Sequence, residues 1–144
     1  MGLLTSEIVV SSSSYIFDGA GGMRDQLEQT IIQELDKKEY PLKVAVETVK
    51  SGSLFFGTKE QCVTINVSKQ KRVVISNTTV GTYLYVTIYL LRMVPNNAAN
   101  TPELVTDIFE HQHIQAAYAA AIESAESAFQ MLNLKQTNSG YKRN

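Results

Sequence analysis

The sequence predicts an α+β fold: an antiparallel sheet of about four to five strands, with an N-terminal helix and a long C-terminal helix packed on one face. Three observations lead to this prediction. Hydrophobic residues recur with helical spacing over 23–38, with a period of two through the middle of the chain, and with helical spacing again in the last third. Because the strands follow one another without alternating helices, antiparallel pairing is favoured over parallel βαβ units.

The composition indicates one globular domain over residues 1–134, followed by a polar tail over 135–144 that we predict to be disordered. Of the 144 residues, 44% are hydrophobic and 19% are charged, which is ordinary for a folded protein. The net charge of -1 argues against general nucleic-acid binding, which needs a basic excess. One cysteine, Cys62, and the lack of a leader pattern lead us to expect a cytoplasmic protein. The longest apolar stretch, 80–94, is too short for a membrane helix, so we expect no transmembrane segment.

The first two elements are an extended segment and a helix. Ile8–Val10 and Tyr15–Phe17 are predicted to be extended, and the serines at 11–14 form either a polar break between two short strands or a bulge. A helix is predicted from about Met23 to Lys38, before Pro41. Its apolar stripe consists of Met23, Leu27, Ile31, Ile32 and Leu35.

Between these two elements lies the glycine loop Gly19–Gly22, with the sequence GAGG. Its position before a helix suits a phosphate loop, but its spacing does not, because Arg24 stands where the dinucleotide fingerprint needs a glycine. We therefore predict that the loop turns the chain into the helix.

The middle of the chain reads as a run of strands with period-two alternation. Leu42, Val44 and Val46 share the inner face of the first, and Phe55 and Phe56 are expected at the edge of the core. Val63, Ile65 and Val67 share one face of the next, which is joined to 72–76 by a hairpin turn at 69–71.

The strand over 83–93 places Tyr83, Tyr85 and Tyr89 on one face and only aliphatic residues on the other. Because both faces are largely apolar, we predict an interior strand covered on both sides. A buried tyrosine needs a partner for its hydroxyl, so the tyrosine face is expected to be a ligand cleft, a subunit interface or the sheet face under the last helix. Together with Tyr118, these tyrosines are the candidate ligand-binding residues.

The last helix is predicted to span 103–134, with Thr101 as its N-cap and Pro102 in its first turn. At 1.5 Å per residue it would be about 48 Å long and would overhang a domain of this size unless it bends near 110–115 or packs on another copy. The alanines at 116, 117, 119, 120 and 121 would permit the close approach of a second helix. The candidate homodimer interface is the seam Tyr118, Ile122, Ala125, Phe129 and Leu132.

Reactive groups are few, and we predict no catalytic residues, no metal site and no cofactor. Asp107 and His111 are four residues apart on one helix face, but two ligands do not make a structural zinc site, and His113 points elsewhere. Cys62 lies at the start of a predicted strand with alternating hydrophobic residues, where a cysteine is usually buried and its thiol inert.

The predicted hairpin tip carries a basic patch of Lys69, Lys71 and Arg72, while the last helix is acidic. This asymmetry would steer an acidic partner towards the tip. The alternative, which we favour, is that the lysines maintain solubility and protect a strand edge.

Two functions remain open. The first is a non-catalytic interaction or assembly module that self-associates, as a homo-oligomer or a subunit of a larger assembly. The second is a small hydrophobic-ligand binding protein, or an enzyme, with a cleft between the sheet and the C-terminal helix. The order of elements resembles the helix-grip architecture of hydrophobic-ligand carriers, which implies the second function.

Overall fold

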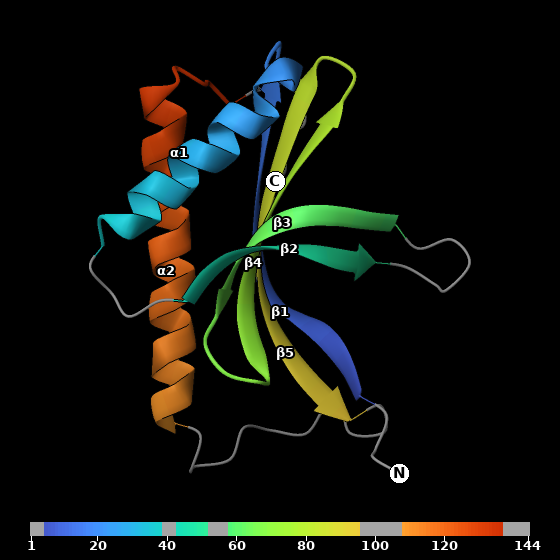
Figure 1. Cartoon of the computed structure of the whole chain (residues 1–144), viewed down its shortest axis with the longest axis vertical. Helices are drawn as coiled ribbons and strands as arrows, with labels where there is room; N and C mark the ends of the chain where they lie inside the picture. Colours follow the sequence, from blue (N-terminus) through green and yellow to red (C-terminus); the bar gives the residue numbers. More distant parts are fainter. Residues whose placement is uncertain (1–4, 39–42, 52–57, 96–107, 137–144) are drawn as a thin grey trace, which may run out of the picture.

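A computed structural model describes residues 5–38, 43–51, 58–95 and 108–136 (Figure 1). Five antiparallel strands form one sheet in the order β1-β5-β4-β3-β2, and two helices cover one of its faces, which confirms the predicted fold class. In chain order the elements are β1 (Thr5–Asp18), the 3-10 helix η1 (Gly21–Met23), α1 (Arg24–Asp36), β2 (Lys43–Ser51), β3 (Thr58–Asn66), β4 (Lys71–Val80), β5 (Tyr83–Pro95) and α2 (Ile108–Met131).

The strand β1 is continuous, and its irregularity is a bulge just before the serine run. Val9 lies opposite Leu91 and Ser11 lies opposite Leu90, so Val10 is the additional residue. A bulge shifts the alternation of side chains by one position. Both halves of β1 can therefore send apolar side chains to the face that the helices cover.

The core lies between the sheet and the two helices. Alternate residues of β5, from Leu84 to Leu90, are at most 2% exposed and meet the helices. The predicted stripe of α1 is confirmed, since Leu27, Ile31 and Leu35 are buried and Met23 and Ile32 pack against them. The buried residues of α2 are mostly small: Ile114, Ala117, Ala120, Ala121, Ser124, Ala125, Ala128 and Phe129.

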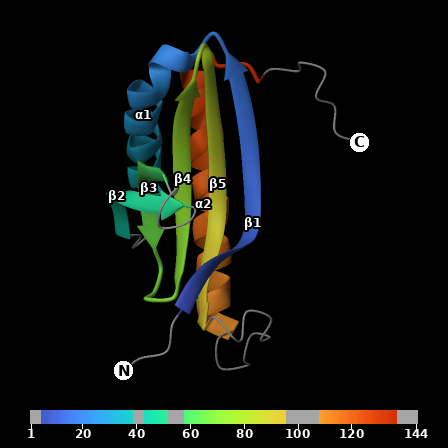
Figure 2. The same ribbon diagram turned by 90° about the vertical axis from the view of Figure 1, so that its right-hand side faces the viewer.

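The helix α2 runs without a break through the polar stretch at 110–115. Its 24 residues span about 36 Å, and the 13 residues of β5 span about 43 Å. The helix therefore lies along the long strands and does not overhang them (Figure 2). The expected overhang, which called for a bend or a second copy, is wrong for the described part of the helix, because the strands beneath it are equally long.

The glycine loop turns the chain and docks on the β4–β5 turn, which confirms its predicted role. Gly19 adopts a φ of +80°, a conformation that glycine adopts without steric cost. A Cβ on Gly21 would lie 2.6 Å from the carbonyl oxygen of Gly81, so only glycine allows this approach. The Gly21 amide donates to the carbonyl of Thr82 at 3.0 Å, and the Thr79 hydroxyl donates to the carbonyl of Gly21 at 2.8 Å.

The sheet bends sharply between β3 and β4, so that the β2–β3 hairpin crosses the long strands (Figure 1). The strands β3 and β4 pair only where Val63–Asn66 of β3 lies beside Arg72–Ile75 of β4. Beyond that point Arg24 of α1 occupies the fork. Its Nε donates to the carbonyl of Asn77 at 2.7 Å and its terminal nitrogen to the carbonyl of Gln61 at 2.8 Å. Arg24 thus supplies donors to one carbonyl on each strand, at a point where the β3–β4 pairing has ended.

One expectation is modified by the structure, and others concern residues that the structure does not describe. Val46 lies on the inner face as expected, opposite Val63, but it is 47% exposed because β2 is an edge strand. The expectations for Leu42, Phe55, Phe56, Thr101 and Pro102, and for the tail beyond residue 136, lie outside the described residues.

Tyr15 of β1 contacts α2. We predict that, because of this contact, the free energy of unfolding falls in alkali. Its ring packs edge-on against Phe129 at 4.9 Å, and its hydroxyl donates to Glu126 at 3.2 Å. Burial and the Glu126 charge raise the pKa of Tyr15 from 10.0 to about 12. Because the folded state holds this proton more tightly, the stabilisation is complete below pH 10.0 and is lost as the pH rises towards 12.

Tyr15→Phe keeps the ring contact with Phe129 and removes the hydroxyl group that titrates. Urea unfolding at a series of alkaline pH values should show a shallower loss of stability in this variant than in the wild type. If the free energy of unfolding fell equally steeply with pH in both proteins, the loss of stability in alkali could not be assigned to Tyr15.

We also predict that the Arg24 bridge contributes measurably to stability. Arg24→Met should lower the free energy of unfolding by about 1–3 kcal/mol, because two carbonyls lose charged donors. The matched control is Lys37→Met on the same helix. Lys37 is 66% exposed and pairs with Glu34, so its loss should cost under about 0.5 kcal/mol. Similar losses in both variants, measured by urea unfolding, would refute the bridge.

Candidate functional site

The face of the sheet opposite the helices is not covered by any described element (Figure 2). Tyr83, Tyr85 and Tyr89 of β5 lie on this face, because their aliphatic neighbours occupy the other. The prediction that β5 is interior is confirmed, since β5 lies between β1 and β4. The prediction that both of its faces are covered holds only in part: on the tyrosine face Leu91 is buried, whereas Tyr83 and Tyr85 are exposed.

Four residues at the β4–β5 turn end of this face form what we call the tyrosine patch: Ile16, Val80, Tyr83 and Tyr85. Val80 lies opposite Tyr83, and Ile16 lies opposite Tyr85, so the four are contiguous. Val80 is 59% exposed, and Tyr83 and Tyr85 are each 41% exposed. The patch therefore presents two aromatic rings and two aliphatic side chains to solvent.

In the other half of the same face, apolar side chains are buried by their own neighbours. Cys62, Val74 and Leu91 are buried there in a small cluster with Val49 and Tyr89 packed against it. The sharp bend of the sheet brings these neighbours together without a second layer. Burial raises the pKa of the Cys62 thiol, which agrees with the predicted inert cysteine.

The four candidate ligand-binding tyrosines are not brought together. Tyr118 lies on α2 at the helix side of the sheet, where its hydroxyl hydrogen-bonds with Ser13 at 3.0 Å. Tyr83, Tyr85 and Tyr89 lie on the opposite side. Period-two alternation placed those three on one face correctly, but it carries no information about which face the helix covers.

The predicted interface seam of α2 lies inside the domain. Ala125 and Phe129 are 0% and 6% exposed, and Tyr118, Ile122 and Leu132 pack against the same core. The neighbour of α2 on this side of the sheet is α1 of the same chain, and the two helices pack against each other. Heptad spacing cannot distinguish an internal helix neighbour from one in another copy.

The three residues of the basic patch point to three different environments. Lys69 is exposed in the turn. Lys71 is 4% exposed and its ammonium lies 3.4 Å from Glu110 of α2. Arg72 faces the uncovered side and donates to both carboxylate oxygens of Glu7 at 2.6 and 2.8 Å, and these bonds raise the pKa of Arg72. Consecutive residues of a strand point to opposite faces, which explains the separation.

Candidate metal ligands are sparse. His111 and His113 are both exposed on α2, and Asp107 lies outside the described residues. Across the described segments, no group of three or more histidine, cysteine, aspartate or glutamate side chains is placed to hold a metal ion.

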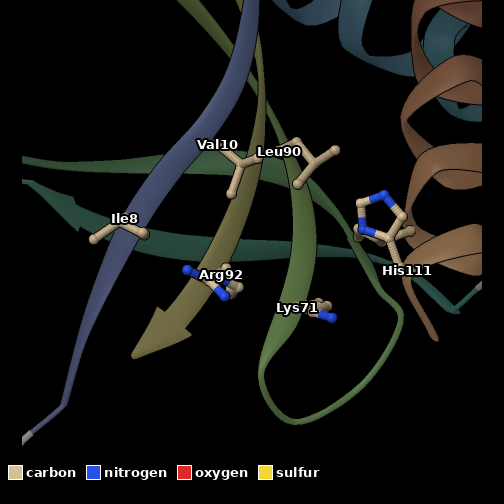
Figure 3. Close-up of a pocket in the computed structure, with 7 residues that line it drawn as sticks. Ile8, Val10, Lys71, Leu90, Arg92 and His111 are labelled. Carbon is tan, nitrogen blue, oxygen red and sulfur yellow. The ribbon is translucent and has the colours of Figure 1, made fainter. Parts of the chain in front are cut away.

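A cavity of about 220 Å³ lies between the sheet and the start of α2 (Figure 3). Its wall is made by Ile8, Val10, Lys71, Leu90, Arg92, His111 and Ile114. A cleft between the sheet and the last helix is one of the two alternatives that the sequence left open, but none of these seven residues was a candidate for lining it. They come from four elements and converge only through the β1 bulge and the strand order, so the sequence carries no local signal for them.

Comparisons with known proteins leave the family open. No family model matches the chain, and a search of curated proteins finds no match. Among solved structures, the open form of parafusin, an exocytosis-sensitive phosphoprotein and phosphoglucomutase from Paramecium, has a TM-score of 0.43 and 14% sequence identity. The comparison covers 94% of this chain and 22% of that one, and a likeness this distant carries no argument about function.

The search for membrane spans is also negative. Within the described segments, no helix has the length and apolar content needed to cross a membrane.

We predict that reversing two charges of the same hairpin has unequal effects. Arg72→Glu places a carboxylate beside Glu7 and Glu47 and should lower the free energy of unfolding by about 2 kcal/mol or more. Lys69→Glu changes an exposed turn residue and should cost under about 0.5 kcal/mol. Chemical denaturation of both variants measures the difference. Equal effects would mean that the Arg72–Glu7 pair does not stabilise the sheet.

Proposed function

We propose that this chain is a non-catalytic interaction module that self-associates through the tyrosine patch. The observation that carries the proposal is the exposure of Tyr83 and Tyr85 beside Val80 on a sheet face that no described element covers. Tyrosine is enriched at protein interfaces, because its ring contributes apolar area while its hydroxyl keeps a polar partner.

A second copy of the chain is the partner that best fits the patch. The four residues of the patch carry no charge, so they offer nothing that would select a strongly charged partner. Two copies related by a two-fold axis would bring the same neutral surface together, as homodimers commonly do. The net charge of -1 also leaves little repulsion between copies.

The charged groups near the patch are engaged within the chain. Asp18 accepts a hydrogen bond from the Thr82 hydroxyl at 3.1 Å. Glu60 accepts from the hydroxyls of Ser76 and Thr78, at 3.2 Å and 3.0 Å for the same carboxylate oxygen. A dimer formed at the patch would thus bury ring and aliphatic surface while these internal hydrogen bonds remain in place.

Sedimentation velocity at tens of micromolar tests the proposal. We expect the wild type to be a dimer. Tyr85→Thr, which retains a strand-forming side chain but removes the ring, should weaken association at least about tenfold, as the loss of an interface hot spot does. Tyr85→Asp should leave a monomer that melts cooperatively.

The matched control is Val46→Asp, because Val46 is 47% exposed and lies on the opposite face, at the β2 edge. This variant should remain a dimer. A monomeric wild type would exclude self-association, and a dimer disrupted equally by Val46→Asp would exclude the tyrosine patch as its interface.

A further inference from the structure

The cavity between the sheet and α2 combines an apolar wall with a group of basic side chains. Ile8 and Val10 of β1, Leu90 of β5 and Ile114 of α2 supply the apolar part. Leu90 and Ile114 are 2% and 1% exposed, so they form the floor, whereas Val10 is 46% exposed and lies at the opening. Figure 3 shows Ile8, Val10 and Leu90 on the two neighbouring strands.

Among the described residues of the wall, the ionisable side chains are all basic: Lys71 of β4, Arg92 of β5 and His111 of α2 (Figure 3). They come from three different elements. Arg92 lies opposite both Ile8 and Lys71 in the sheet, so the two cationic residues are cross-strand neighbours.

Glu110 of α2 is an acidic partner of this group. Its carboxylate lies 3.4 Å from the ammonium of Lys71 and accepts a hydrogen bond from Ser68 at 3.2 Å. Glu110 does not line the cavity, whereas Lys71 does. Among the described residues of the wall, the ionisable side chains are therefore the three basic ones, of which Lys71 is also paired with Glu110.

We propose that this cavity binds a small amphiphile with one anionic head and a short alkyl tail. The head would lie against Arg92 and Lys71, since guanidinium and ammonium groups form strong charge-assisted hydrogen bonds with carboxylates and phosphates. The tail would lie against Leu90, Ile114 and Ile8, where each methylene leaves water for an apolar surface. A cationic or zwitterionic head would meet repulsion from the same side chains.

The size of the cavity limits the tail. A volume of about 220 Å³ is below the range of about 300–1,000 Å³ found for pockets that enclose drug-sized ligands. A medium-length chain fits this space better than a long fatty acid or a whole lipid. This inference does not depend on self-association, because the tyrosine patch lies on the opposite face of the sheet. It corresponds to the second function that the sequence left open, a cleft between the sheet and the last helix.

Calorimetric titration of the full chain with octanoate and with 1-octanol tests the proposal. Octanoate should bind saturably at millimolar concentration or below, and the neutral alcohol should bind at least about tenfold more weakly, because it lacks the charge that Arg92 and Lys71 recognise. Hexanoate should bind more weakly than octanoate, by about fourfold for each methylene removed.

A pair of neighbouring substitutions locates the site. Val10→Glu places a carboxylate at the opening and should weaken octanoate binding by about tenfold or more through repulsion of like charges. Val9→Glu is the matched control, because Val9 is 55% exposed, adds the same charge one residue away and does not line the cavity. This control should bind octanoate as the wild type does.

Arg92→Met separates charge recognition from apolar binding. It should weaken octanoate binding by about tenfold and leave the affinity for 1-octanol unchanged, since only the anion loses a partner. Thermal melts of each variant without ligand confirm that the fold is retained.

Several results would overturn the proposal. Octanoate that fails to bind, or binds no better than 1-octanol, removes the anionic amphiphile as the ligand. Equal losses in Val10→Glu and Val9→Glu, or no loss in Val10→Glu, remove the cavity as the site. Binding to phosphatidylglycerol vesicles without binding of free octanoate would assign the basic group to a membrane surface and refute a site for a soluble ligand.

Discussion

The close packing of α1 and α2 against each other on one face of the sheet is the constraint on which the rest of the structure depends. A single helix cannot cover a five-stranded sheet, so two helices must share one face. The small residues of α2, among them Ala117, Ala121 and Ala128, let α1 approach closely, while the larger side chains of α1 fill the space above the sheet. Any larger residue on this strip of α2 would separate the two helices and open the core.

Both helices lie on one face of the sheet, and no described element covers the other. The side chains of that other face must therefore pack against one another. The bend at the fork between β3 and β4 achieves this over half of the face, where Cys62, Val74 and Leu91 are buried by their own neighbours. Arg24 holds the fork by donating to one carbonyl on each strand. The other half of the face remains exposed, and the tyrosine patch lies there.

One strand, β5, contributes to both candidate sites. Its first residues place Tyr83 and Tyr85 on the uncovered face, and its last residues place Leu90 and Arg92 at the cavity on the helix side. The two sites lie at opposite ends of the strand and on opposite faces of the sheet. A protein that self-associates through one and binds a small anion at the other would need no further element to carry both functions.

The sequence by itself determined the fold class, the stripe of α1, the interior position of β5 and the role of the glycine loop, because periodicity and turn chemistry are local properties. It also placed Tyr83, Tyr85 and Tyr89 on one face. Only the tertiary structure decided which face that was, whether the α2 seam packed inside or outside, and which residues met at the cavity. These depend on contacts between residues far apart in the chain, such as Lys71 with Glu110, and a one-residue bulge at Val10 shifts the alternation on which such contacts depend.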